Sequence, residues 1–322
     1  MAKNSFDVIL SDFNMPGKTG FDLLADLQGN LTTRAIPVII LTGSAEKNIK
    51  RQALENGATD LLNKPVEYTD LIARITSAIR LKSYQDEVIQ HNLTLEKRVQ
   101  ERTAELEFLR LDLIWRLAKA GEMRDEDTGD HVIRVAQYSR QVAIAIGLSK
   151  KETDLILFTS PLHDLGKIGI PDNLLQKKGK LDADEWSIMK RHCQLGASIL
   201  LEKPKGMKLL EAENQFAPAL FAIDDELRTT AASIALSHHE KWDGSGYPHG
   251  LSGTDIPLPG RIVALADVYD ALRSKRPYKS ELSRKDAWSI IEKGVGKHFD
   301  PYIFEKIKDM QDTFERIRDI HQ

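Results

Sequence analysis

The sequence has little that would tie it to a membrane or to an oxidising compartment. Cys193 is the only cysteine among 322 residues, so an intrachain disulfide is excluded. No run of about 18 apolar residues predicts a membrane span, and Asp7 interrupts the N-terminal apolar segment, which does not resemble a secretory signal. A formal net charge of −3 gives no support for DNA as a partner. We therefore expect a cytoplasmic protein with room for two domains.

Residues 1–82 alternate between strand-like and helical patterns. The runs FDVILSD and IPVIILTG are continuously apolar and end in small or polar residues, as buried parallel strands do. Helical spacing follows in TGFDLLADLQ, EKNIKRQALENG and VEYTDLIARITSAIR. This alternation predicts an α/β domain with a partial parallel sheet.

Residues 83–118 are highly charged and contain neither glycine nor proline. They carry a heptad-like series with two polar interruptions, formed by Val88, Asn92, Leu95, Val99, Arg102, Leu106, Leu109 and Leu113. This spacing favours a coiled-coil linker helix that joins two copies into a homodimer. The alternative is a single amphipathic helix packed against its own domain. Helical periods dominate residues 119–322, which predicts an all-α helical bundle.

The first domain resembles a response-regulator receiver. The resemblance rests on SDFNMPGKTG, LTGSA and LLNKPVE, which follow one another in the order typical of that family. It implies that Asp12 is the phosphoacceptor, Thr42 the switch hydroxyl and Lys64 the phosphoryl contact, all at the carboxyl ends of parallel strands. Taken singly, each could be an ordinary polar residue at the end of a strand.

The receiver resemblance lacks its usual beginning. A complete receiver starts with a strand whose acidic pair holds a magnesium ion, then a helix and a further strand, whereas here the third strand starts near residue 6. The domain therefore looks truncated at its N-terminus, and we expect Asp12 to accept phosphate poorly. We also expect the remaining sheet to have an exposed edge and an uncovered face.

Histidines and aspartates recur in apolar helical contexts in the second domain. Imidazole nitrogens and carboxylate oxygens are ligands for Fe, Mn, Zn or Ni, and a carboxylate can bridge two cations. One such histidine would more often be structural, but burying several without a compensating cation is costly. The candidate ligands are His131, His163, Asp164, His192, His238, His239 and Asp267.

Residues 119 to about 310 resemble the HD-GYP family, a subset of the HD metal-dependent phosphohydrolases. The motifs that carry the resemblance are DTGDH, HDLGKIGIPD, MKRHCQLGASIL, HHEKWDGSGYP and ALADVYDALRSKRPYK. The resemblance implies hydrolysis of a cyclic dinucleotide, usually cyclic di-GMP, to linear pGpG and often onward to GMP, so the final product stays open. Two alternatives stay open: another cyclic dinucleotide such as cyclic GMP-AMP, or a receptor or interaction module without turnover.

The resemblance also assigns roles around the metals. Two divalent ions, Fe or Mn with Zn or Ni as alternatives, would share Asp164 and activate a water for attack on phosphorus. Lys167 follows Asp164 by three positions, which on a helix places it on the same face, where it could meet a phosphate oxygen. The alternative for Lys167 is a surface lysine.

Substrate contacts are implied for three further residues. Arg276 and Lys279 would bind phosphate, although both could equally form a solvated turn. Tyr247 would stack or hydrogen-bond near the pocket. The alternative for Tyr247 is a purely structural role in its loop. In the signalling setting, a histidine kinase and a diguanylate cyclase are the implied partners.

Two positions depart from the family pattern. The segment 202–228 is longer than the usual connection; we expect a surface connection there, with an extra helix or a flap as the alternative. Asp127 stands where the family often has glutamate, and its shorter carboxylate favours two metals over three. Asp127 could instead cap the following helix.

Overall fold

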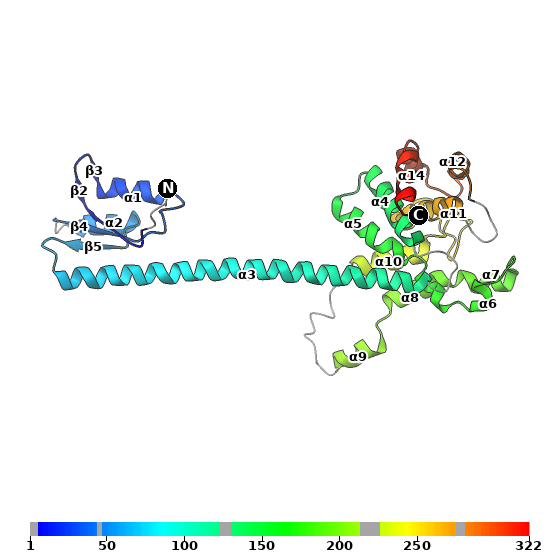
Figure 1. Cartoon of the computed structure of the whole chain (residues 1–322), viewed down its shortest axis with the longest axis horizontal. Helices are drawn as coiled ribbons and strands as arrows, with labels where there is room; N and C mark the ends of the chain where they lie inside the picture. The colour runs from blue at the N-terminus through cyan, green and yellow to red at the C-terminus, as the bar shows by residue number, and fades with distance from the viewer. Residues whose placement is uncertain (1–5, 44–46, 123–129, 213–225, 275–280, 322) are drawn as a thin grey trace. The chain divides into compact units, whose positions relative to one another are not determined.

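The computed structural model describes residues 6–43, 47–122, 130–212, 226–274 and 281–321. The chain divides into two compact units, residues 1–105 and 106–322. Figure 1 labels the helices and strands of each unit. Each unit is described by itself below.

The first unit contains a parallel sheet whose strand order is β1-β4-β5. Its strands are β1 (Ile9–Asp12), β4 (Val38–Thr42) and β5 (Asp60–Asn63), and a separate two-stranded ribbon pairs β2 (Asn14–Met15) with β3 (Lys18–Thr19). In the register, Asp12 lies opposite Leu41 and Thr42 lies opposite Asn63, so the carboxyl ends of all three strands meet at one edge. The predicted parallel α/β architecture is confirmed.

Helices cover both faces of this sheet. The helices are α1 (Gly20–Gln28), α2 (Lys47–Glu55) and α3 (Tyr68–Glu122). On one face, Leu24 of α1 and Ala53 of α2 pack on Val38 and Ile40. On the other face, Ala78 of α3 packs with Ile39 and Leu62.

The expectation of a wholly uncovered sheet face is therefore wrong. Alternate residues of β4 point to opposite faces, and Val38, Ile39 and Ile40 are all at most 1% exposed because both faces have a helical cover. The sheet is more open near β1, where Leu10 is 40% exposed. The cover on the second face comes from the N-terminal turns of α3, in the helical pattern VEYTDLIARITSAIR.

α3 is one continuous helix of 55 residues. The change in composition near residue 82 does not interrupt it, because no glycine or proline occurs between residues 68 and 120 to end the helix. Seam side chains are exposed, for example Val99 at 64% and Leu106 at 67%. Near its end, Ile114 and Ala118 pack on Leu162 and Leu165 of the second unit. The seam side chains thus face solvent in a single copy of the chain. The last turns of α3, by contrast, pack against helices of the second unit.

The second unit is helical, as predicted. Its α-helices are α4 (Asp130–Ala145), α5 (Lys150–Thr159), α6 (Asp172–Leu175), α7 (Ala183–Lys190), α8 (His192–Leu201), α9 (Lys205–Ala212), α10 (Glu226–Ser237), α11 (Leu258–Arg273), α12 (Arg284–Lys293), α13 (Pro301–Ile307) and α14 (Gln311–Ile320). The 3-10 turns are η1 (Ser160–Leu162), η2 (Leu165–Gly169) and η4 (Gly253–Asp255). Within the described residues, this unit has only isolated β-bridges.

An aromatic cluster holds the C-terminal helix α14 in the core. Phe314 of α14 stacks on Tyr138 of α4, with ring centroids 4.8 Å apart, and meets Tyr269 of α11 edge-on at 5.0 Å. Trp288 of α12 contacts the same phenylalanine at 5.6 Å. Such contacts add to the apolar burial of the rings, so α14 is an integral part of the bundle.

The long segment 202–228 contains the helix α9 over its first part. The extra-helix alternative, rather than a plain surface connection, therefore describes residues 205–212; residues 213–225 lie outside the described part. Of the helices that are described, none combines the length and the apolarity needed to cross a bilayer.

Candidate metal centre

The predicted ligands come from separate elements and converge in the second unit. His131 lies in the first turn of α4, and His163 and Asp164 lie between η1 and η2. His192 begins α8, His238 and His239 follow α10, and Asp267 lies in α11. They form two groups whose ligand atoms lie within 4.8 Å of one another: Asp164, His192, His238 and His239 in one, and His131, His163 and Asp267 in the other. Each group offers enough donors to hold one cation.

Asp164 joins the two groups. Its Oδ1 lies 3.4 Å from His192 Nε2 and 3.7 Å from His238 Nε2, while its Oδ2 lies 3.3 Å from His163 Nε2. Within the second group, Asp267 Oδ1 is 3.5 Å from His131 Nε2. One carboxylate oxygen therefore faces each group, which is the arrangement that a bridging ligand needs.

Backbone carbonyls fix the direction of three imidazoles. Nδ1 of His163 lies 2.8 Å from the Ser160 carbonyl oxygen, and Nδ1 of His192 lies 2.8 Å from that of Met189. His238 Nδ1 is 3.1 Å from the Ile234 carbonyl oxygen. Because a carbonyl oxygen only accepts, Nδ1 carries a proton in each ring, and whenever the ring is neutral the lone pair of Nε2 faces the cluster.

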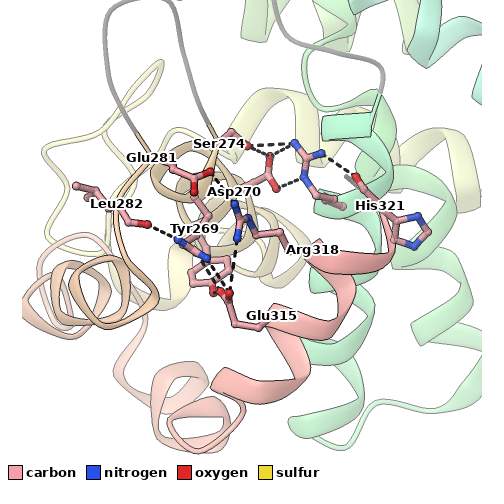
Figure 2. Close-up of polar contacts among 10 residues, drawn as sticks. Tyr269, Asp270, Ser274, Glu281, Leu282, Glu315, Arg318 and His321 are labelled. Atoms are coloured by element: carbon pink, nitrogen blue, oxygen red, sulfur yellow. Dashed lines mark hydrogen bonds and ion pairs between the residues drawn. The ribbon is translucent and has the colours of Figure 1, made fainter.

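His131 is oriented by Asp270, a residue that the sequence analysis missed. Asp270 is 1% exposed, and its Oδ2 lies 2.7 Å from His131 Nδ1. Arg134 donates to both oxygens of this carboxylate, at 2.7 and 3.0 Å, and Ser274 donates to it at 3.1 Å (Figure 2). Two spacings in the sequence could have revealed this contact: Asp270 follows Asp267 by three residues, and Arg134 follows His131 by three.

A second carboxylate, Glu315 of α14, extends this polar network toward the C-terminus (Figure 2). It accepts hydrogen bonds from Tyr269 at 2.7 Å and from Arg273 at 2.7 and 3.0 Å. Arg273 also donates to the Leu282 carbonyl oxygen, and Arg318 of α14 pairs with Glu281 at 2.7 Å. The network therefore ties the end of α11 and residues 281–282 to α14.

A glycine lets the His-Asp motif approach α8 closely. A Cβ on Gly166 would lie 1.9 Å from the His192 carbonyl oxygen and 2.4 Å from Gly196 N. No side chain fits at that distance, so glycine is required by close approach of the two backbones. The contact fixes Asp164, two residues earlier, against the start of α8.

The buried acids and bases of the cluster lie close enough to shift one another's pKa values. Burial disfavours a charged His163, but the adjacent Asp164 carboxylate outweighs burial and raises the pKa of His163 to about 9. Burial would raise the pKa of Asp164, yet Lys167 and His163 hold it well below its usual range. Lys167 Nζ lies 2.8 Å from Asp164 Oδ2. Asp164 is thus an ionised carboxylate, as a metal ligand must be.

The donor set fits divalent metal ions. Among the described residues, His163 Nε2, Asp164 Oδ1 and His238 Nε2 are buried without a hydrogen-bond partner. Leaving such atoms unsatisfied is costly, and a cation between them would satisfy all three. A cavity of about 260 Å³ opens onto both groups and is lined by His131, Asp164, Lys167, His239, Asp267, Val268, Ala271 and Leu272. Lys167 thus lies at the cavity, as the same-face prediction required.

Glu240 organises the loop that carries Tyr247. Its carboxylate accepts from the backbone N–H groups of His249 at 2.7 Å and Leu251 at 3.1 Å. A Cβ on Gly246 would lie 2.3 Å from Lys241 N, so this loop also folds back closely on itself. The Tyr247 ring consequently lies 4.8 Å from that of His239, beside the cluster.

Three predicted site residues cannot be placed. Asp127, Arg276 and Lys279 lie outside the described residues. The polar network around Arg273 and Glu281 brackets the segment that holds Arg276 and Lys279.

The receiver-like residues also come together. Lys64 Nζ lies 2.5 Å from Asp12 Oδ1, and Lys64 N donates to the Thr42 carbonyl oxygen at 2.8 Å. Both charged side chains are more than 40% exposed, while Thr42 is 2% exposed. The strand ends therefore form one small polar site, as the order of the motifs predicted.

A larger cavity lies away from the histidines. Its volume is about 1080 Å³, and it lies between α3, α5, α8 and α10, with Arg110, Phe158 and Leu200 among its lining residues. Neither histidine group contributes to this lining. Size alone would therefore select the wrong site, and the unsatisfied histidine and aspartate atoms identify the smaller one.

Comparison with known proteins agrees with this fold and cluster. Residues 117–303 match the HD domain family, and residues 1–76 match the response regulator receiver domain. The cyclic di-GMP phosphodiesterase response regulator RpfG of Xanthomonas campestris is 39% identical over 295 residues, which cover 92% of this chain and 73% of that protein. A cyclic di-GMP phosphodiesterase of Thermotoga maritima is 34% identical, covering 97% of this chain and 82% of that protein.

A 3'3'-cGAMP-specific phosphodiesterase of Vibrio cholerae, the second of that name, is 42% identical over 207 residues, covering 64% of this chain and 36% of that protein. The helical bundle and its cluster of histidines and aspartates define a divalent metal-dependent phosphohydrolase of the HD type. The chain belongs to the HD domain family and carries a receiver domain ahead of its HD domain.

Proposed function

We propose that this chain is a metal-dependent phosphodiesterase that hydrolyses cyclic di-GMP to pGpG and onward to GMP. The observation that carries the proposal is the pair of ligand groups that face opposite oxygens of Asp164, with Lys167 beside them. Relatives that span most of this chain are named cyclic di-GMP phosphodiesterases, which supports the same substrate here.

The chain's residues would hold two divalent ions, one in each ligand group, with Asp164 shared. When bound, such ions supply Lewis acidity and an activated water. Imidazole and carboxylate donors suit Fe or Mn, with Zn or Ni as alternatives. We keep two ions rather than three because the carboxylate of Asp127 is one methylene shorter than that of glutamate, a difference of about 1.5 Å in reach.

Lys167 is the side chain best placed to meet the substrate phosphate. Its ammonium group lines the cavity and lies 2.8 Å from Asp164 Oδ2, so it can stabilise charge on a phosphate oxygen beside the shared ligand. Tyr247 would close the side of the cavity near His239. We further propose Arg276 and Lys279 as phosphate contacts, on the resemblance of SKRPYK to its family motif.

Cyclic GMP-AMP is the second candidate substrate. A phosphodiesterase named for 3'3'-cGAMP shares 42% identity with this chain over 207 residues. A receptor without turnover is less well supported, because simple binding gives no reason to bring together every ligand of two metal groups.

Product analysis tests the proposed function. Protein loaded with Mn²⁺ or Fe²⁺, and the same protein after chelation, would be incubated with cyclic di-GMP, cyclic GMP-AMP and cyclic di-AMP, and products would be resolved over time. We expect pGpG to appear first, followed by GMP, only with metal and fastest from cyclic di-GMP. Metal-loaded protein that binds cyclic di-GMP but releases no linear product would instead indicate a receptor.

For the receiver unit, we propose that Asp12 is the residue a histidine kinase would phosphorylate, with the poor acceptance expected above. The pairing of Asp12 with Lys64, beside Thr42, supports this role. A diguanylate cyclase, which makes the cyclic dinucleotide that this chain would hydrolyse, is the other proposed signalling partner. A small phosphodonor should label the wild type only weakly and Asp12→Asn not at all. Efficient labelling of the wild type that is lost in Asp12→Asn would contradict the poor acceptance, and equal labelling of both proteins would overturn the choice of Asp12.

We also infer a homodimer through α3. Its seam presents Leu95 at 44%, Val99 at 64% and Leu106 at 67% exposure, and a second copy would bury these side chains. Sedimentation at high micromolar concentration should give a dimer for the wild type and a monomer for the double variant Val99→Glu/Leu106→Glu. A monomeric wild type would contradict the inference.

A further inference from the structure

An aromatic and cationic cluster extends outward from the metal centre, and of its three residues only Tyr247 has been given a role so far. It consists of Trp186 and Lys190 on α7 together with Tyr247. The Trp186 and Tyr247 rings meet edge to face, with centroids 5.9 Å apart. Lys190 Nζ lies over both rings, 5.9 Å from the first centroid and 5.5 Å from the second.

This cluster is directly connected to the metal ligands. The Tyr247 ring is 4.8 Å from the His239 ring and 6.4 Å from the His192 ring. Moreover, α7 ends at Lys190 and α8 begins at His192, so the last turn of α7 leads straight into a ligand. Tyr247 therefore stands between the cluster of ligands and Trp186.

Trp186 and Lys190 have features that a purely structural role does not require. Trp186 is 43% exposed, although burying an indole ring is favourable. Lys190 is the one charged residue among Trp186, Lys190 and Tyr247. Among the described residues, no carboxylate lies at ion-pair distance from it. Lys177, by contrast, pairs with Glu185. An open indole face beside an unpaired ammonium group can receive a flat, hydrogen-bond-accepting ring.

We propose that Trp186 and Lys190 form the nucleobase platform of this site: Trp186 stacks on one purine of the substrate, and Lys190 donates a hydrogen bond to its carbonyl oxygen. The proposal rests on the proposed function, because it needs a dinucleotide whose phosphate lies at the metals. In such a substrate one sugar separates each base from a phosphate. In the site, the Tyr247 ring lies between the platform and His239, so a base could reach Trp186 while the phosphate lies at the metals.

The chemistry favours guanine over adenine. Guanine presents two acceptors, O6 and N7, to a lysine, whereas adenine replaces O6 with an amino donor. Stacking tolerates either base. Trp186 should therefore contribute to affinity for any purine, and Lys190 to the preference for guanine.

Steady-state kinetics on the metal-loaded chain tests the platform. Trp186→Ala should raise KM for cyclic di-GMP about tenfold or more, with little change in kcat, because a stack present in both ground and transition states affects binding alone. Trp186→Phe should restore most of the loss. The matched control is Ile188→Ala, a 38% exposed apolar residue two positions along the same helix and hence on another face.

Lys190→Met should raise KM for cyclic di-GMP several-fold and leave the inhibition constant of cyclic di-AMP nearly unchanged. An equal rise for both nucleotides would mean that Lys190 meets phosphate, and would overturn its guanine-reading role. If wild-type protein turns over cyclic di-GMP and Trp186→Ala has the KM of the Ile188→Ala control, the platform is wrong while the proposed function stands. Absence of wild-type turnover would instead remove the proposed function.

Discussion

The two polar sites of this chain differ most in their access to water. At the receiver site, the side chains of Asp12 and Lys64 are 42% and 46% exposed, and the one carboxylate oxygen that water does not reach, Asp12 Oδ1, is paired with Lys64 Nζ at 2.5 Å. At the metal centre, Asp164 is 16% exposed and His163 is fully buried, and atoms of both lack partners. An exposed ion pair is complete without a ligand, whereas a buried unsatisfied cluster is complete only when a cation arrives.

The largest effect expected from this difference is in Asp164→Ala. Removing the shared carboxylate should lower turnover of cyclic di-GMP by about a thousandfold or more, equivalent to about 4 kcal/mol, and reduce the bound metal. Circular dichroism should show the helical domain still folded. Asp154→Ala, which removes a half-buried aspartate paired with Lys150, is the control and should keep wild-type turnover. Normal turnover in Asp164→Ala would end the metal mechanism.

Asp270→Asn tests whether a buried carboxylate that contacts a ligand, but is not a predicted ligand itself, also supports the metal centre. It weakens the contacts of a 1% exposed carboxylate with His131 and Arg134, so the unfolding free energy should fall by about 3 kcal/mol. Metal affinity should fall by about 10- to 100-fold, because His131 loses its orienting partner. Urea unfolding and metal titration measure the two effects. Ser274→Ala, which removes a weaker contact to the same carboxylate, should change both much less; equal effects would contradict this account.

His298 supplies a pH test of the second unit. Burial, aided by Lys241, lowers the pKa of His298 from 6.5 to about 4. The folded state therefore favours the neutral ring, and the unfolded chain takes up the proton first as the pH falls. The stability contributed by this group is complete above pH 6.5 and is lost as the pH falls toward 4, a loss of about 1–3 kcal/mol.

Urea unfolding of chelated protein at several pH values between 7 and 4 measures that loss. His298→Phe keeps a ring against Phe299, on which His298 stacks at 4.3 Å, and should flatten the pH dependence. His249→Asn, at an exposed histidine, should leave the dependence as in wild type. If both variants follow the wild-type curve, His298 does not carry the acid sensitivity.

The smallest effect is expected at the receiver site. Asp12→Asn removes an exposed ion pair and should change the unfolding free energy of the first unit by less than about 1 kcal/mol. Chemical unfolding followed by far-UV circular dichroism would measure it, with Asp26→Asn, which breaks the exposed Lys18 pair, as the matched control. A loss of several kcal/mol at Asp12 alone would show that the two sites do not differ as described.

Much of this architecture could be predicted from the sequence. Apolar runs of β length and helical periods indicated the α/β unit, the long helix and the helical bundle, because those periodicities reflect which faces are buried. The motifs DTGDH, HDLGKIGIPD, MKRHCQLGASIL, HHEKWDGSGYP and ALADVYDALRSKRPYK together contain the residues of both groups. The side chains of His131 and Asp267 lie far apart in sequence, yet the resemblance placed them at one site, and the structure brings them together.

What the sequence did not reveal depends on contacts between distant segments. Asp270 orients His131 across 139 positions; its spacing of three from Asp267 places it on the ligand face of a helix but does not identify its partner. The role of Gly166 depends on how closely α8 approaches, and the cover of the second sheet face depends on how the first turns of α3 pack on Ile39 and Leu62. Trp186 follows the helical pattern of α7, and only its place beside Tyr247 suggests a role in recognising a base.

Metal-edge anomalous diffraction from crystals grown with saturating Mn²⁺ or Fe²⁺ tests the central claim most directly. The account predicts two well-occupied peaks, one among Asp164, His192, His238 and His239 and one among His131, His163 and Asp267, with Asp164 ligating both. A third peak held by Asp127 would refute the two-metal preference. A fully loaded crystal with no metal at either group, or with Asp164 contacting none, would contradict the account itself.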